Sequence, residues 1–469
     1  MAPSPSRIAS GKRYFRSLLD SDDVYNDDLT IVTKVVALIV KLPETKRAFK
    51  WENTRLNWNE HVTKLLHTKE FDQTYRMSHD AFKNLLEILR PMITVDVVKS
   101  CNSMPSSEPI YPELVMHIGV RWLAGGSYAD IRDVAGVSTA SVVRCRNMFM
   151  DAVLESSDLD FKFPQTMEEV TEAAMRFQEK SSNGAMTGCV GCVDGILIPI
   201  QQPSGVDNPR AYFSGHYHMM GLNVQAVCDE RLRFTYIAVA APGKSIPVDY
   251  SASVFTLYVL NAYRYESTNI CIVVSFPLPY TALHPGKSSD LTAYDGINLS
   301  KLVERLPLGF YVVGDPAYAP TEHMLTPYSG KHREDECNSM FNFYLSQLRI
   351  RIEMAFGQLT TQWRILRSPL TTSLETAGKV VECCARLQNF CITQDHDDTC
   401  SAAVEVCTVE SLSADDADGL GYMVTETDPG IVAITGKSHL RDIVRQSLSD
   451  NGFQRPQYNI VRNKTMPTM

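Results

Sequence analysis

The chain has 469 residues, of which 44% are hydrophobic and 21% charged, and it carries a formal net charge of −9. Its length predicts two domains with additional tails, and its composition is that of an ordinary globular protein. The longest apolar runs are too short, or too interrupted by lysine and proline, to cross a bilayer, which argues against a membrane protein. The first residues lack an apolar signal core, so we expect an intracellular protein.

The twelve cysteines show no disulfide-rich rhythm, which favours a reducing compartment. Cys189 and Cys192 have the spacing of half a zinc site, but no second pair with suitable spacing follows. We therefore interpret both as small apolar packing residues in a strand.

The negative charge is unevenly distributed. Residues 395–436 contain ten Asp or Glu and neither Lys nor Arg, so the rest of the chain is close to neutral. We expect 394–469 to be an acidic, largely disordered tail. Because the rest of the chain is close to neutral, the overall negative charge does not argue against a local DNA-binding surface.

The first half predicts a helical region. After an N-terminal extension (1–70, partly disordered), residues 71–155 contain a helix capped by Ser78 and ended by Pro91, followed by helices over 113–124, 128–135 and 139–153. The turn at 136–138 gives the last two helices a helix-turn-helix pattern. The third helix presents Arg144, Arg146 and Asn147, which suit phosphate or base contacts. The alternative is a three-helix bundle that only packs.

The second half predicts an α/β domain over 185–393. Strands at 188–200, 218–228 and 233–240 have the spacing of an antiparallel meander, and a buried strand at 310–313 ends at Asp315. Helices over 338–363 and 376–392 follow, so the fold class is α/β, a mixed sheet flanked by helices.

One segment interrupts this order. The tetrapeptide PGKS at 242–245 recurs at 285–288, and the residues between have no clear amphipathic period. We interpret 244–286 as an insertion, either genuine or a retained intron in the gene sequence.

Three acids stand out by position. Asp194 lies on the first strand of the second domain, Asp315 closes a later strand, and Glu353 lies in the middle of a helix. Clustered carboxylates repel one another unless cations are present, and a pair of Mg²⁺ or Mn²⁺ ions suits oxygen ligands and phosphodiester chemistry. Each acid also has a structural alternative: a turn cap for Asp194, an Asx-turn for Asp315, and an ion pair with Arg349 for Glu353.

The second domain contains several motifs in a fixed order: GCVDGILIPI, LNVQAVCD, PGKSSD, LPLGFYVVGDPAY, LTPY, FNFYLSQLRIRIEMAFGQL and WRIL. From Gly191 to about Leu370 the chain resembles the DDE domain of PIF/Harbinger transposases and their domesticated nuclease relatives. The resemblance implies an RNase H-like fold in which Asp194, Asp315 and Glu353 form a metal-binding catalytic triad, with Asp290 in support. It also implies that the preceding helix-turn-helix binds DNA.

The resemblance further implies a nuclear protein that acts on DNA together with a Myb-like accessory protein. A cytoplasmic location is also left open. Oligomeric state is not determined by the sequence, so a homo-oligomer stays open. Arg349 and Arg351, with Arg364 and Arg367, are expected to meet a DNA backbone, unless they only form a solvated helix face. The rival hypotheses are a catalytically inactive DNA-binding or scaffold protein and an RNase H-like nuclease acting on RNA hybrids.

Overall fold

The computed structural model describes residues 54–95, 109–206, 208–215, 217–240, 299–398 and 439–456. The region interpreted as an insertion, 244–286, and Asp290 lie outside these residues. In the part of the chain that is described, no helix is both long and apolar enough to cross a membrane.

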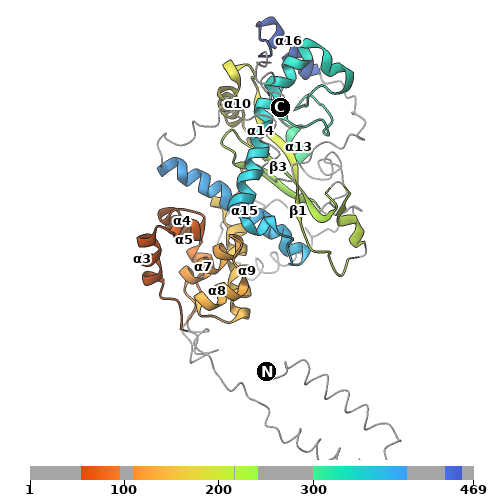
Figure 1. The fold of residues 1–469 in the computed structure, drawn as a ribbon. Helices are drawn as coiled ribbons and strands as arrows, with labels where there is room; N and C mark the ends of the chain where they lie inside the picture. The colour runs from red at the N-terminus through yellow and green to blue at the C-terminus, as the bar shows by residue number, and fades with distance from the viewer. Residues whose placement is uncertain are drawn as a thin grey trace, which may run out of the picture. The chain divides into compact units, whose positions relative to one another are not determined.

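The first described helices form one group (Figure 1). Three of them begin at a serine whose hydroxyl accepts a hydrogen bond from a backbone amide three residues ahead, namely Ser78, Ser127 and Ser138. Gly136 ends a helix in the left-handed conformation, at φ 62°, and so forms the predicted turn. The helices are α3 (Trp58–Thr68), α4 (Phe71–Tyr75), α5 (His79–Ile93), α7 (Pro112–Leu123), α8 (Tyr128–Ala135) and α9 (Thr139–Glu155).

Close packing of α7 on α9 holds this group together. A Cβ at Gly119 of α7 would lie 2.2 Å from the Phe149 ring of α9, so only glycine permits this approach. The predicted helices are confirmed, with two corrections. The helical region begins at Trp58 rather than at 71, because α3 buries Val62 and Leu65 in the shared core. Helix α5 continues past Pro91 to Ile93.

The second half forms the predicted mixed sheet. The meander is confirmed: β1 pairs antiparallel with β3, and β3 pairs antiparallel with β4. On its other side β1 pairs in parallel with β5, which pairs in parallel with β6. The strands are β1 (Cys189–Pro199), β2 (Phe213–Ser214), β3 (Met219–Cys228), β4 (Phe234–Ala240), β5 (Tyr311–Val313) and β6 (Met324–Leu325).

Helices cover both faces of the sheet. On one face Val193, Val227 and Val312 pack with α10 (Met167–Lys180) and α13 (Leu299–Val303). On the other face the sheet packs against α14 (Glu336–Gln362) and α15 (Leu374–Asp398), in a core continuous with that of the helical region. Short 3-10 turns connect these elements: η1 (Ser157–Leu159), η2 (Ser182–Gly184), η3 (Pro209–Tyr212), η4 (Gly330–Glu334) and η5 (Arg364–Arg367).

The expectation of a largely disordered 394–469 is wrong for part of that range. Helix α16 (His439–Asp450) packs against α14, beside which it is drawn in Figure 1. Arg445 Nη1 donates to Asn338 Oδ1 at 3.0 Å, and the ring of Phe453 lies 5.5 Å from that of Tyr344. Leu440, Val444 and Leu448 of α16 also pack in the main apolar core, so this helix is part of the folded domain.

Candidate active site

Two of the three predicted acids lie at the same edge of the sheet. In the parallel pair β1–β5, Cys192 lies opposite Val313, and Asp194 and Asp315 each follow two residues later. Side chains two residues apart in a strand point to the same face, so Asp194 shares the face of Cys192, which α14 covers; Asp315 lies two residues beyond the end of β5. Both are buried, with exposed fractions of 1% and 3%.

Local hydrogen bonds orient these two carboxylates. Asp194 Oδ1 accepts from the amide of Gly195 at 2.8 Å, and Asp315 Oδ1 accepts from the amide of Ala317 at 2.9 Å. The second bond is the Asx-turn that we named as the structural alternative for Asp315. It fixes the side chain and is compatible with a further role for the carboxylate.

Helix α14 supplies the third acid together with an arginine. Arg349 Nη1 lies 2.5 Å from Glu353 Oε1 and 3.8 Å from Asp194 Oδ2. Burial lowers the pKa of Arg349, but the charges of Glu353, Asp194 and Asp315 outweigh it and raise that pKa. Arg349 therefore pairs with Glu353 and approaches Asp194, and its pKa also responds to the charge of Asp315.

The position of α14 over the sheet follows from contacts next to this group. Cys192 Sγ donates to the carbonyl of Leu348 at 3.0 Å, one residue before Arg349. Cys189 and Cys192 are both buried in the core, as the packing interpretation requires. Burial of this part of β1 under α14 thus brings Arg349 within reach of Asp194.

This arrangement bears directly on metal binding. Within the described residues, no three His, Cys, Asp or Glu side chains are arranged as a ready metal site. Arg349 is the positive charge nearest to Glu353 and Asp194 in the contacts described above. Counting only these four side chains, one positive charge faces three carboxylates, two of them buried. This donor set has the oxygen chemistry that Mg²⁺ or Mn²⁺ prefers.

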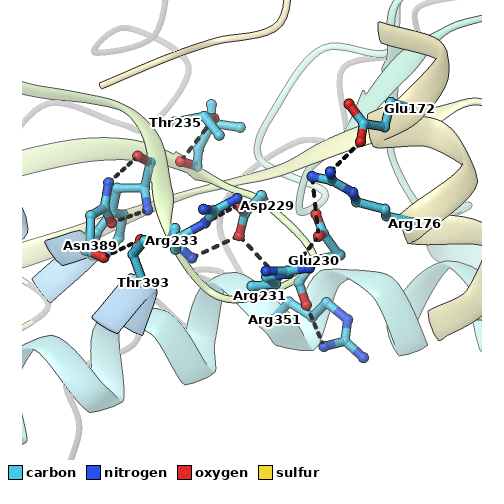
Figure 2. Close-up of polar contacts among 12 residues, drawn as sticks. Glu172, Arg176, Asp229, Glu230, Arg231, Arg233, Thr235, Arg351, Asn389 and Thr393 are labelled. Atoms are coloured by element: carbon cyan, nitrogen blue, oxygen red, sulfur yellow. Dashed lines mark hydrogen bonds and ion pairs between the residues drawn. The ribbon is translucent and has the colours of Figure 1, made fainter. Parts of the chain in front are cut away.

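Arg351 points into the protein, at the turn between β3 and β4 (Figure 2). Its Nη1 donates to the carbonyl of Glu230 at 3.2 Å. The Glu230 carboxylate, only 4% exposed, lies 3.9 Å from Arg176 and 3.4 Å from Arg231. Burial, with the charge of Asp229, raises the pKa of Glu230 above its ordinary value. Arg351 therefore ties α14 to this turn, and its contact with DNA stays a prediction.

The same turn is held from two further sides. Asp229 Oδ1 accepts from the amides of Arg231 and Arg233, and its Oδ2 lies 2.7 Å from Arg233 Nε. Asn389 of α15 bonds both the amide and the carbonyl of Phe234 at 2.7 Å (Figure 2). These bonds join α14 and α15 to the sheet through one loop.

In the helical region, Arg144 and Asn147 are exposed on α9, as expected. The expectation that Arg146 is exposed is wrong. It is 7% exposed, its guanidinium lies 4.6 Å from the centre of the Trp122 ring, and it bonds Tyr128 Oη and Asn147 Oδ1. Arginine stacks well on aromatic rings, so Arg146 holds α9 to α7 and α8.

Sequence reasoning missed the central place of Arg349 among the acids. The four-residue spacing to Glu353 indicated one ion pair. The approach to Asp194 has no local signal, because the two residues are joined only by the packing of a helix on a distant strand.

Comparison with known proteins agrees with this geometry. Residues 193–245 and 267–389 match the family described as DDE superfamily endonuclease, and the matched residues include Asp194, Asp315 and Glu353. The unmatched residues 246–266 fall inside the segment interpreted as an insertion, but 244–245 and 267–286 of that segment are matched, so the family match supports only a shorter insertion. These findings support a DDE-superfamily nuclease family for the α/β domain.

A curated protein from Arabidopsis thaliana, "Protein ALP1-like", is 21% identical over 329 residues, which cover 70% of this chain and 71% of the relative. No solved structure matches the chain significantly.

Proposed function

We propose that the protein is a metal-dependent DNA endonuclease or transposase of the PIF/Harbinger type, built on an RNase H-like fold. The observation that carries this proposal is that Arg349 pairs with Glu353 and approaches Asp194, while the charge of Asp315 also raises the pKa of Arg349. The family match that includes all three acids supports it, as does a mixed sheet with helices on both faces.

Asp194, Asp315 and Glu353 would hold the Mg²⁺ or Mn²⁺ ions. When bound, these ions would supply charge stabilisation at the scissile phosphate and an activated water or 3′-hydroxyl. One oxygen of Asp194 and one of Asp315 accept a backbone hydrogen bond, which restricts the orientation of each carboxylate. Glu353 and Arg349 have side chains 27% and 29% exposed, so they are the more accessible members of the group.

Helices α8 and α9, joined by the turn at Gly136, form the proposed helix-turn-helix. Arg144 and Asn147 lie exposed on α9 and serve as its DNA contacts. Nuclear localisation, a Myb-like accessory protein and a homo-oligomer belong to this proposal through the resemblance.

A second function is favoured by one specific observation. Arg349 neutralises Glu353 and approaches Asp194, so the acid group is partly compensated by the protein itself. A domesticated protein that binds DNA without cutting it fits this arrangement, and the 21% identity of the relative leaves room for it.

The deciding experiment is plasmid nicking with Mg²⁺ or Mn²⁺ by the wild type and by Asp315→Ala. Metal-dependent nicking that is lost in the variant supports the nuclease. Equal products from both proteins would remove the enzyme, and preferential cutting of an RNA–DNA hybrid would replace it with a hybrid-specific nuclease. DNA binding without any cutting would favour the inactive protein.

A further inference from the structure

We propose that Arg76, Arg121, Arg364 and Arg367 form a binding site for the phosphate backbone of duplex DNA, hereafter the four-arginine site. The inference rests on the proposed action on DNA. It adds a contact surface that lies neither on α9 nor among the carboxylates.

The four residues come from three separate stretches of the chain. Arg76 follows α4, Arg121 is in the last turn of α7, and Arg364 and Arg367 begin and end η5. The positive charges of Arg364, Arg121 and Arg367 act on Arg76 and, together with burial as the larger cause, lower its pKa. The fold thus gathers like charges that are distant in sequence.

Direct contacts hold these stretches together. The side-chain amide of Gln362 donates to the carbonyl of Arg76 at 2.8 Å, which joins the end of α14 to the end of α4. A Cβ at Gly125, in the turn after α7, would lie 3.0 Å from the Cβ of Arg364. The amide of Gly126 donates to the carbonyl of Arg121 at 2.9 Å in the same turn. The four-arginine site therefore has a fixed framework.

None of the four arginines forms an ion pair with a carboxylate among the described residues, although most other buried or half-buried arginines of the α/β domain do. The charges that act on Arg76 are all positive. Burial, together with the charges of Arg121 and Lys64, lowers the pKa of His61. A concentration of like charge destabilises the free protein unless an anion binds to it.

The anion that we propose is a row of phosphates. Arg364 and Arg367 are exposed, and Arg76 and Arg121 are half-buried, so all four are partly open to solvent. Arg367 is held in place by bonds to Thr360 O at 3.0 Å and to Thr361 Oγ1 at 2.9 Å. Oriented guanidinium groups suit phosphate oxygens.

The four-arginine site lies beyond the C-terminal end of the helix that carries Glu353. Glu353 is nine residues before the end of α14 at Gln362, about 14 Å along the helix axis at about 1.5 Å per residue, and Arg364 follows two residues after that end. A duplex lying along this part of α14 would reach the carboxylates and the four-arginine site together.

The test measures the affinity of the protein for a fluorescently labelled duplex by anisotropy, without divalent metal, over a series of KCl concentrations. We expect Arg364→Gln and Arg367→Gln to weaken binding about 3- to 10-fold each, regardless of DNA sequence. Each should also reduce the dependence of log affinity on log salt by about one. Arg364→Lys should restore the salt dependence. Arg333→Gln, which removes an exposed arginine elsewhere, is the matched control and should bind as the wild type does.

Three outcomes would overturn the inference. The first is that the glutamine variants bind DNA with the affinity and salt dependence of Arg333→Gln. The second is that the wild type does not bind duplex DNA. The third is that polyglutamate competes as well as DNA at equal charge, which would identify a general anion site. The thermal midpoints of the free variants verify that they are folded.

These results are separable from those for the proposed function. Nicking by a wild type whose DNA binding does not depend on the four arginines would refute only the four-arginine site. Arginine-dependent binding without any nicking would refute only the enzyme.

Discussion

Arg349 Nη1 lies 2.5 Å from Glu353 Oε1, one helical turn away on α14, and reaches Asp194 on β1 through the same nitrogen. A single side chain therefore connects the helix acid to a strand acid. This connection makes the charge balance of the site, rather than any one carboxylate, the property to test first.

Arg349→Met keeps a long stem but removes the charge that compensates the acids. We expect the free energy of unfolding without metal to fall by about 1–3 kcal/mol, because buried carboxylates lose a partner, with part of the effect screened by solvent. Added Mn²⁺ should recover more stability in this variant than in the wild type. Urea unfolding with and without Mn²⁺ measures both effects. Equal gains from Mn²⁺ in the two proteins would show that Arg349 does not compete with the metal.

Comparison of Asp315→Asn with Asp315→Ala separates the contribution of the Asx-turn hydrogen bond from that of the carboxylate charge. Asparagine can still accept the hydrogen bond from the amide of Ala317, whereas alanine cannot. We expect the alanine variant to be about 1 kcal/mol less stable than the asparagine variant, and both to lose metal-dependent nicking. Nicking by Asp315→Asn at the wild-type rate would contradict the role of the charge.

Arg146→Met should destabilise the protein by roughly 2–4 kcal/mol, because Arg146 is buried against Trp122 and bonded to Tyr128. The neighbouring change Arg144→Gln removes an exposed charge, so stability should be unchanged while DNA affinity falls. Thermal unfolding and anisotropy on both variants check the pair. A stable Arg146→Met with weakened DNA binding would instead place Arg146 at the DNA interface.

His117 should make the stability of the protein depend on pH. Burial, with the charges of His61 and Arg121, lowers the pKa of His117 from 6.5 to about 3. The unfolded chain therefore binds the proton more readily than the folded protein does. This contribution to stability is complete above about pH 6.5 and is lost as the pH falls toward 3, at about 1.4 kcal/mol per unit.

The control for this prediction is His117→Gln, whose side chain can still bond the Tyr75 hydroxyl that now lies 2.8 Å from His117 Nδ1. Urea unfolding between pH 7 and 4 should give a shallower loss of stability in this variant. Parallel curves for the two proteins would show that another group causes the dependence.

Much of the fold was predictable because its signals are local. Capping serines and Gly136 mark the helix boundaries, and the unbroken apolar run before Asp315 indicates a buried strand. The two-residue strands β2 and β6 were not predicted, because pairing across the sheet, and not a local pattern, defines them. Helix α16 was missed because an acidic neighbourhood dominated the composition of its region.

The residues of the site also fall into those with a local sequence signal and those without one. The order of Asp194, Asp315 and Glu353 along strands and a helix indicated that they would meet, whereas the inward orientation of Arg146 and Arg351 could not be inferred. Both arginines are on helices with polar neighbours, where exposure is the ordinary expectation. The orientation of Arg146 is decided by the position of Trp122, and that of Arg351 by the position of the Glu230 carbonyl.

The docking of α16 on α14 also has a consequence for synthesis. Tyr344 and Asn338 of α14 leave the ribosome about a hundred residues before the Phe453 and Arg445 that cover them. The contacts that Asn338 and Tyr344 make in the folded protein can therefore form only after α16 and Phe453 have been synthesised.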